Sequence, residues 1–409
     1  AIYETLHREN QVLVCAQSNT AVDWISEKLV DRGVPVLRIG NPTRVNDKML
    51  SFTYERRFES HPAYTELWGI RKSIREMNGR IRKGSHIERE NMRNRISHLR
   101  DRATELEILI NEALFSSTRV VASTLVSSNH RILNGRRFST LFIDEAAQAL
   151  EAACWIAIRK ADRVIFAGDH CQLPPTIKCI EAARGGLDHT LMEKVVANKP
   201  ISVSLLKVQY RMNESIMRFP SELFYNNQLE SAPEIRQRGI LDFDTPMIWI
   251  DTSEMECHEE FVGESFGRIN KPEANLLLQE LESYIQKIGE NRVLDEQIDF
   301  GLISPYKAQV QYLRNKIKSS RFFRRFRPLI TVNTVDGFQG QERDVIFISL
   351  VRANESGQIG FLNDLRRMNV AITRARMKLV ILGNATTLTK HTFYHKLMEY
   401  IQKETVIRS

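Results

Sequence analysis

Short runs of apolar residues alternate with longer amphipathic stretches along most of this chain. A short apolar run bounded by polar residues is typical of a buried strand in a parallel sheet. In the first half of the chain, the pattern predicts strands at residues 12–16, 34–40, 120–124, 141–143 and 164–167. In the second half, it predicts strands at residues 203–208, 246–251, 300–304, 330–332, 345–350 and 378–382.

The stretches between these strands carry apolar residues three and four positions apart, which predicts helices. Strands that alternate with helices are typical of parallel sheets covered by helices, so we expect an α/β fold. Two such series predict a first domain over residues 1–200 and a second over residues 201–409. The predicted helices are residues 24–32, 187–196, 214–225, 272–289, 307–318 and 364–374.

Residues 48–115 interrupt the first series, because they show little strand pattern and much charge. This segment predicts a helical insertion with a hairpin turn at Gly84–Ser85. Its basic residues could form an arm over a nucleic acid, or simply a solvated face of the helix pair. The apolar seam that supports the helices consists of Ile96, Leu99, Ala103, Leu106, Ile110 and Ala113.

The composition is that of a soluble globular protein, with 42% hydrophobic and 26% charged residues among 409. No apolar stretch is long enough to span a membrane, so we expect no membrane association. The five cysteines are scattered and form no C-x-x-C pair, which predicts no zinc site and an intracellular location, cytoplasmic or, in a eukaryote, nuclear. The net charge of +8 agrees with a polyanionic partner without establishing one.

Acidic residues stand directly after two of the predicted strands in the first domain. Asp144 and Glu145 follow residues 141–143, and Asp169 follows residues 164–167. Asp144 could hold Mg²⁺, and Glu145 could deprotonate an attacking water, as nucleotide hydrolysis requires. The alternative is a strand end with two solvated acids. In the loop GDHCQLPP, Gln172 can both donate and accept, so it could sense a terminal phosphate.

Candidate arginines occur in the second domain, where phosphoryl transfer would need positive charge near the γ-phosphate. Arg211 follows Tyr210 at the start of a predicted helix, and Arg374 lies in the sequence NVAITRAR. Either motif alone is weak evidence for an arginine that contacts the γ-phosphate, since surface arginines are common. The glycines of VDGFQGQE, among them Gly340, allow the backbone to approach a ligand closely.

The motifs DEAAQA, GDHCQLPPT, QYR, VDGFQGQE and TRAR occur in this order within residues 11–385. Together they resemble the superfamily 1 helicases of the 1B branch, in particular the immunoglobulin-mu-binding-protein and nonsense-mediated-decay types. The resemblance implies two RecA-like P-loop NTPase lobes with a helical insertion in the first. It also implies an ATP-dependent helicase or translocase that uses ATP and Mg²⁺ between the lobes. We expect a monomer that moves 5′ to 3′ along single-stranded DNA or RNA.

The same resemblance implies roles for individual residues. The catalytic residues would be Asp144 (also the Mg²⁺ ligand), Glu145, Gln172, Arg211 and Arg374. The nucleotide would be bound by Tyr210, Gly340 and Glu342. The nucleic acid would be bound by Ser18, Asn19, Thr124, Pro305, Tyr306 and Thr334. For Ser18 and Asn19, capping of the following helix is an alternative that is compatible with phosphate contact.

Residues 320–327, SRFFRRFR, interleave basic and aromatic side chains. This pattern is typical of surfaces that bind a single strand by charge and stacking. The alternative is a basic loop whose aromatic rings face the protein core.

A phosphate-binding loop of the form G-x-x-x-x-G-K-[ST] does not occur in the sequence. The resemblance places this loop just before residues 1–10, so we expect Ala1 to lie a few residues past it in a longer protein. We then expect these 409 residues alone to bind ATP poorly, because the loop and its lysine bind the β- and γ-phosphates. The alternative function is a nucleic-acid-binding or scaffolding protein with an inactive nucleotide site.

Overall fold

The computed structural model describes residues 1–81, 86–263 and 267–408, and the predicted Gly84–Ser85 turn lies outside them. The chain forms two compact units. Unit 1 contains Ala1–His170 and Pro174–Ser202, and unit 2 contains Cys171–Leu173 and Val203–Ser409. In the described part of the chain, no helix has the length and apolar character needed to cross a membrane.

Unit 1 is built on a five-stranded parallel sheet in the order β2-β3-β1-β4-β5. Alternate residues of β1 face opposite layers: Leu13 and Cys15 pack with α6, and Val12 and Val14 pack with α2. The strands are β1 (Val12–Ala16), β2 (Val36–Ile39), β3 (Val120–Thr124), β4 (Phe138–Asp144) and β5 (Ala161–Phe166). The helices around them are α1 (Ile2–Leu6), α2 (Asn19–Val30), α6 (Glu151–Ile158), α7 (Ile180–Ala182) and α8 (Leu191–Asn198).

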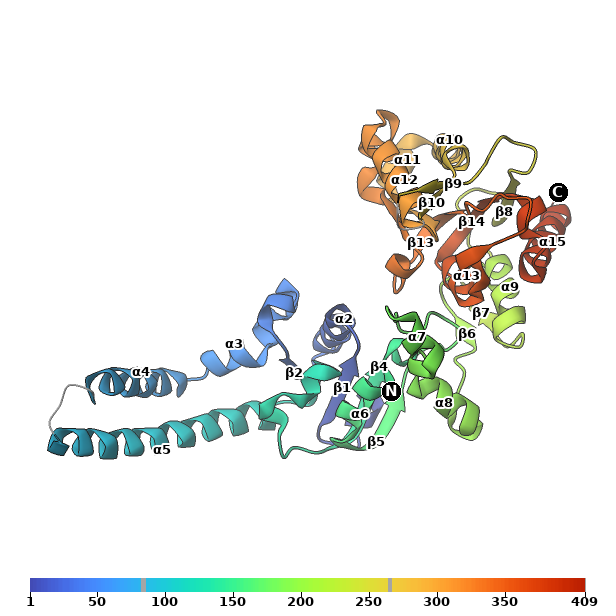
Figure 1. Ribbon diagram of the computed structural model, residues 1–409. Coiled ribbons are helices and arrows are strands. Elements are labelled where there is room, and N and C mark those ends of the chain that lie inside the picture. Colours follow the sequence, from blue (N-terminus) through green and yellow to red (C-terminus); the bar gives the residue numbers. More distant parts are fainter. Residues whose placement is uncertain (82–85, 264–266, 409) are drawn as a thin grey trace. The chain divides into compact units, whose positions relative to one another are not determined.

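A helical hairpin projects from this sheet (Figure 1). It consists of α4 (Tyr64–Ile81) and α5 (His86–Ser116), and the short α3 (Tyr54–Glu59) precedes it. Along the hairpin, Arg102 Nε lies 2.9 Å from Glu66 Oε1, and Arg71 Nη2 lies 2.5 Å from Glu107 Oε1. The apolar seam holds the helices together, because Ile96, Ala103, Leu106 and Ile110 are buried.

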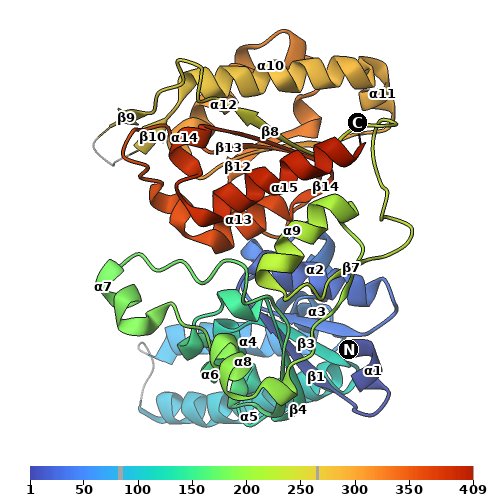
Figure 2. The same ribbon diagram turned by 90° about the vertical axis from the view of Figure 1, so that its right-hand side faces the viewer.

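Unit 2 is built on a second five-stranded parallel sheet in the order β12-β11-β13-β14-β8. Helices cover both faces: α10 and α12 pack on one, and α9, α13 and α15 on the other (Figure 2). The strands are β8 (Met247–Asp251), β11 (Phe300–Ser304), β12 (Ile330–Thr334), β13 (Arg343–Ser349) and β14 (Ala375–Gly383). The helices are α9 (Glu214–Phe224), α10 (Lys271–Ile288), α11 (Glu290–Asp295), α12 (Lys307–Ser319), α13 (Leu365–Ile372), α14 (Ala385–Leu388) and α15 (Thr392–Arg408).

The predicted α/β fold with two parallel sheets is confirmed, but one predicted strand is wrong. Residues 203–207 form no strand, and only β6 (Val208–Gln209) pairs with β7 (Glu230–Ser231). The apolar side chains of this stretch are exposed, Leu206 to 87%. A run of apolar residues forms a strand only if it can pair with the edge of a sheet, and residues 203–207 pair with no strand in the described part of the chain. The remaining small sheet pairs β9 (Glu260–Val262) with β10 (Gly267–Ile269).

A buried polar network joins the start of α10 to the end of β13. The Glu273 carboxylate accepts hydrogen bonds from Ser349 Oγ at 2.6 Å and from Val351 N at 2.9 Å. Asn270 Nδ2 donates to Val351 O at 3.2 Å, so both backbone groups of Val351 are held. Val351 has a φ of 70°, a left-handed conformation that is costly for a β-branched residue. The network therefore stabilises a strained turn.

Glu273 gives this network a predictable pH dependence. Burial raises the pKa of Glu273 to about 7 from its ordinary value of 4.5. Because the folded state binds this proton more tightly, the free energy of unfolding falls as the pH rises from 4.5 to 7, by about 3 kcal/mol in total. We expect Glu273→Gln, which keeps one acceptor and carries no charge, to remove most of this loss.

Urea unfolding of the wild type and Glu273→Gln at acidic and mildly alkaline pH measures the effect. The substitution should stabilise the protein at alkaline pH and have a much smaller effect at acidic pH. A variant equally destabilised at both pH values would contradict the raised pKa, because it would show that Glu273 does not change its protonation state between them.

Candidate functional site

The carboxyl ends of three neighbouring strands meet at one edge of the unit 1 sheet. In the parallel register, Ala16 of β1 lies opposite Thr124 of β3 and opposite Asp144 of β4. Ser18 and Asn19 follow β1 directly, so they belong to the same edge. Open α/β sheets bind their ligands at this edge. The predicted catalytic and nucleic-acid-binding residues of unit 1 are therefore near one another.

The two acids at the end of β4 are held in different ways. Asp144 is half-buried, and burial raises its pKa above the ordinary value. Carboxylate oxygens are ligands that Mg²⁺ prefers, so Asp144 fits a metal-binding role. Glu145 has a φ of 51°, which is left-handed, and its Oε2 accepts a hydrogen bond from Gln148 Nε2 at 2.7 Å. The turn and Gln148 together fix the direction of the Glu145 carboxylate.

The chain segments that follow β4 and β5 approach each other closely beside this acidic pair. Ala146 N donates to Ala167 O at 2.9 Å, and a Cβ atom at Gly168 would lie 3.0 Å from Ala146 N. A side chain at position 168 would therefore push against the backbone that carries Glu145. The glycine of GDHCQLPP keeps these two segments together.

The other candidates in unit 1 are small polar side chains with local hydrogen bonds. Ser18 Oγ accepts from Ala21 N at 3.1 Å, so it does cap α2. Thr124 Oγ1 donates to Ser127 Oγ at 2.8 Å. Asn19 is half-exposed at the first position of α2. Contact with a nucleic acid stays a prediction for Ser18, Asn19 and Thr124.

In unit 2, predicted catalytic and nucleotide-binding side chains form a cluster at the amino ends of β13 and β14. Arg374 Nη2 donates to Gln172 Oε1 at 2.8 Å. Arg211 Nε donates to Glu342 Oε2 at 2.5 Å, and Arg211 Nη1 donates to Thr373 O at 3.2 Å. The structure thus brings Gln172, Arg211, Glu342 and Arg374 together.

The loop that carries Gln172 is anchored within unit 2. Asn369 Nδ2 donates to Cys171 O at 2.9 Å, and Leu173 is buried in the core of the unit. Arg374 is only 2% exposed, and its Nε donates to a backbone carbonyl at 3.0 Å. Packing and hydrogen bonds therefore fix the guanidinium of Arg374 beside the neutral amide of Gln172.

Arg376, which the sequence pattern left without a role, lies among several acids beside this cluster. Its guanidinium is 3.2 Å from Asp344 Oδ1, 3.4 Å from Asp299 Oδ2 and 3.7 Å from Glu342 Oε1. Burial raises the pKa of Asp344. Glu342 is thus shared between Arg211 and Arg376. The only signal in the sequence was the second arginine of TRAR.

Tyr210 and Gly340 lie near this cluster in sequence and have distinct geometries. The Tyr210 side chain is 67% exposed, so its ring is available for stacking. Gly340 has a φ of 73°, where a side chain would strain the backbone. This left-handed turn comes just before Glu342 and sets the path of the chain into β13.

Pro305, Tyr306 and Thr334 belong to the carboxyl edge of the unit 2 sheet, where Ser304 of β11 pairs with Thr334 of β12. Tyr306 is only 4% exposed, and its hydroxyl lies 3.5 Å from Arg352 Nη1. Because its ring is buried, Tyr306 would influence nucleic-acid binding only indirectly, through the residues that it packs against. Thr334 is half-buried and its Oγ1 accepts a backbone hydrogen bond at 3.3 Å. The three roles stay predictions.

The aromatic residues of the segment 320–327 pack toward the core of unit 2, with Phe322 only partly buried. Phe323 is 2% exposed and Phe326 is fully buried, and both pack into the core beneath α10 and α12. Stacking of these rings on bases is therefore a wrong interpretation, and the alternative of core-facing aromatics is confirmed. The arginines between them remain at the surface.

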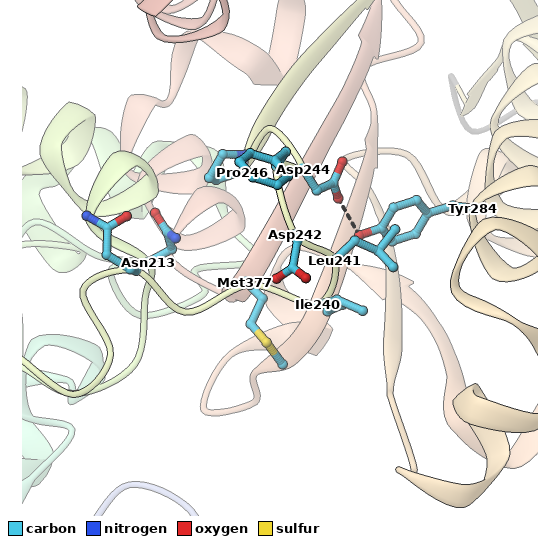
Figure 3. A pocket seen from close by; sticks show the side chains of 11 residues that line it. Asn213, Ile240, Leu241, Asp242, Asp244, Pro246, Tyr284 and Met377 are labelled. Carbon is cyan, nitrogen blue, oxygen red and sulfur yellow. Dashed lines mark hydrogen bonds between the residues drawn. The ribbon is translucent and has the colours of Figure 1, made fainter. Parts of the chain in front are cut away.

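A cavity of about 480 Å³ opens in unit 2 beside the loop that precedes β8 (Figure 3). Asp244 and Tyr284 are among its lining residues. Asp244 Oδ2 accepts from the Tyr284 hydroxyl at 2.7 Å, and Asp244 Oδ1 accepts from the buried Lys378 Nζ at 2.8 Å. The charge of Asp244 is therefore paired with that of Lys378 within the protein. None of the predicted site residues lines the cavity.

Known proteins and protein families match almost the whole chain. Two family models, each described as an AAA domain, match residues 2–179 and 187–386. An uncharacterized ATP-dependent helicase of Methanocaldococcus jannaschii is 32% identical over 98% of this chain. The DNA-binding protein SMUBP-2 of Mesocricetus auratus is 32% identical over 100% of it. A homolog of regulator of nonsense transcripts 1 from Arabidopsis thaliana is 34% identical over 97% of it.

This chain spans only part of these relatives: 64% of the archaeal protein, 42% of SMUBP-2 and 30% of the Arabidopsis protein. Among solved structures, that of the arterivirus nonstructural protein 10 helicase aligns with 93% of this chain and 55% of its own, at 14% identity and a TM-score of 0.44.

Proposed function

This chain belongs to the superfamily 1 helicases, and from that premise we propose that the intact protein hydrolyses ATP to move along single-stranded nucleic acid. The observation that carries the proposal is the Arg374–Gln172 hydrogen bond beside the Arg211–Glu342 pair. It supports the proposal because two guanidinium groups, one of them buried against a neutral amide, lie close together in unit 2. Phosphoryl transfer needs positive charge near the γ-phosphate, which these groups would supply.

The acids of unit 1 would perform the proton chemistry of hydrolysis. Asp144 fits as a Mg²⁺ ligand, and a bound Mg²⁺ supplies charge neutralisation for the phosphates. Glu145 would accept a proton from the attacking water. Its left-handed backbone and the hydrogen bond from Gln148 hold the carboxylate in one direction, as a general base requires.

The unit 2 residues would bind the nucleotide and stabilise charge on the transferred phosphoryl group. Arg374 and Arg211 would supply positive charge. Gln172 would sense the terminal phosphate, and its hydrogen bond with Arg374 would couple the two side chains. The exposed ring of Tyr210 suits stacking on the base. Glu342, which follows the Gly340 turn, would accept a hydrogen bond from the ribose.

The nucleic acid would be held through its backbone. In this proposal Ser18, Asn19 and Thr124 of unit 1 contact phosphates, and Pro305, Tyr306 and Thr334 of unit 2 shape a second contact. Backbone contacts of this kind suit DNA and RNA alike. One matched relative is named as a DNA-binding protein and another as a regulator of nonsense transcripts, so both polymers remain substrates to test.

Strand displacement tests the proposed activity and its direction. The intact protein, with ATP and Mg²⁺, should displace a labelled strand from duplexes with a 5′ single-stranded tail. Displacement from 3′ tails only would contradict the proposed 5′ to 3′ direction. Tight binding without displacement from any DNA or RNA duplex would contradict helicase activity.

A further inference from the structure

A buried ion pair joins Arg38 of β2 to Asp23 of α2. Arg38 occupies a strand position that is 0% exposed, and Asp23 of α2 is 3% exposed. Arg38 Nε donates to Asp23 Oδ1 at 2.8 Å, and Asp23 Oδ2 accepts from Asn46 N at 3.0 Å. A buried ion pair contributes little net stability compared with an apolar pair of similar volume. Stability alone therefore does not explain this arrangement.

The guanidinium of Arg38 extends past Asp23 to Asn19. Its Nη2 donates to Asn19 Oδ1 at 2.9 Å, and its Nη1 donates to Ile39 O at 2.6 Å. A guanidinium has donors and no acceptor, so the atom of the Asn19 amide that faces Arg38 must be the oxygen. The amide nitrogen of Asn19 must then point away from Arg38.

The Asn19 nitrogen is placed to meet an anion. Asn19 is half-exposed, and the hydrogen bonds among the described residues include none donated by its Nδ2. Both N–H groups of the amide are therefore available on the side away from Arg38. If the amide rotated by half a turn, it would present its oxygen there and repel a phosphate.

We propose that Arg38, held by Asp23, is a positioning residue that fixes the Asn19 amide with its two N–H donors toward the phosphate backbone of a bound single strand. The inference rests on the proposed function and adds to it the atom by which Asn19 binds and the residue that orients it. Arg38 itself is fully buried, so it acts only through Asn19.

Substitutions of Asn19 test which atom binds. Asn19→Ala removes the donors and should weaken binding of fluorescein-labelled oligo(dT) and oligo(U) by about tenfold, the value of one charge-assisted hydrogen bond. Asn19→Asp keeps an acceptor for Arg38 but replaces the donors with a carboxylate oxygen, so it should weaken binding further. Binding of Asn19→Asp as tight as that of the wild type would overturn the proposal.

A double-mutant cycle tests whether Arg38 acts through Asn19. Arg38→Lys keeps the charge beside Asp23 but loses the planar fork that also reaches Asn19. It should weaken oligonucleotide binding several-fold in the wild type and have no further effect in Asn19→Ala. Thermal unfolding serves as the structural readout. The loss of stability from Arg38→Lys should be smaller in Asn19→Ala, where the hydrogen bond from Arg38 Nη2 is already absent.

Equal weakening of binding by Arg38→Lys in both backgrounds would overturn the positioning role and leave Arg38 as a purely structural residue. If Arg38→Lys does not fold, Asp23→Asn replaces it in the same cycle, since it releases the guanidinium from its anchor. Absence of binding by the wild-type protein would overturn the proposed function and this inference with it.

Discussion

Replacing Glu145 with glutamine should lower the rate of ATP hydrolysis by the intact protein by about 10²–10⁴-fold. The amide has nearly the same shape as the carboxylate and can still meet Gln148, but it cannot accept a proton from water. Binding of single-stranded nucleic acid should stay within about twofold of the wild type, because that contact rests on other residues. Phosphate release and fluorescence anisotropy measure the two effects in parallel.

Glu151→Gln is the matched control for charge removal in unit 1. Glu151 lies on α6 and pairs with Lys194 at the surface, an interaction of small energy. Its substitution should leave turnover nearly unchanged. Hydrolysis by Glu145→Gln at the wild-type rate would show that Glu145 is not the general base.

The second large effect is expected at Arg374. Replacing it with alanine should lower turnover by about 10³-fold or more, since an arginine that stabilises the transferred phosphoryl group contributes on that scale. The same substitution removes the hydrogen bonds that the guanidinium donates to Gln172 Oε1 and to the carbonyl oxygens of Val370 and Gln341, so it should also destabilise the protein.

Arg374→Lys separates the two consequences. It keeps the charge but loses the fork that contacts Gln172, so turnover should still fall while the protein stays folded. Arg325→Ala, at an exposed arginine that pairs with Glu290, is the control and should change neither property. A folded Arg374→Lys variant with wild-type turnover would contradict the role given to the guanidinium.

Most of the fold could be predicted because a parallel strand buried on both faces leaves a clear apolar run. The strand over residues 300–304 is observed at the predicted bounds as β11. The failure at residues 203–207 has a physical cause. The pattern of apolar residues shows which side chains a segment could bury, but a strand also needs a neighbouring strand to pair with. Residues 203–207 have no such partner, and their apolar side chains are exposed.

The candidate site could be predicted in part. Gln172, Arg211, Glu342 and Arg374 are named by their motifs, and the structure places their side chains in one cluster. Supporting residues could not be found in this way. Arg38 reads as one polar position in a strand, and its role depends on Asn19 and Asp23, which only the fold brings to it.

The pKa of a buried acid could not be predicted from the sequence either. In the sequence, Glu273 is an ordinary residue in the first turn of a helix. Only tertiary packing places its carboxylate on Ser349 Oγ and on the backbone of Val351. The energetic cost of burying the charge, and hence the raised pKa, follows from those neighbours and from the loss of water.

Nucleic-acid-stimulated ATP hydrolysis is the most direct test of the central proposal. The rate of phosphate release by the intact protein should rise on addition of single-stranded DNA or RNA. The apparent affinity for the stimulating polymer should fall as salt is raised, because phosphate contacts release counterions. Binding of both polymers with no hydrolysis of ATP in the presence of either would contradict the account and favour a protein that binds nucleic acid without an active nucleotide site.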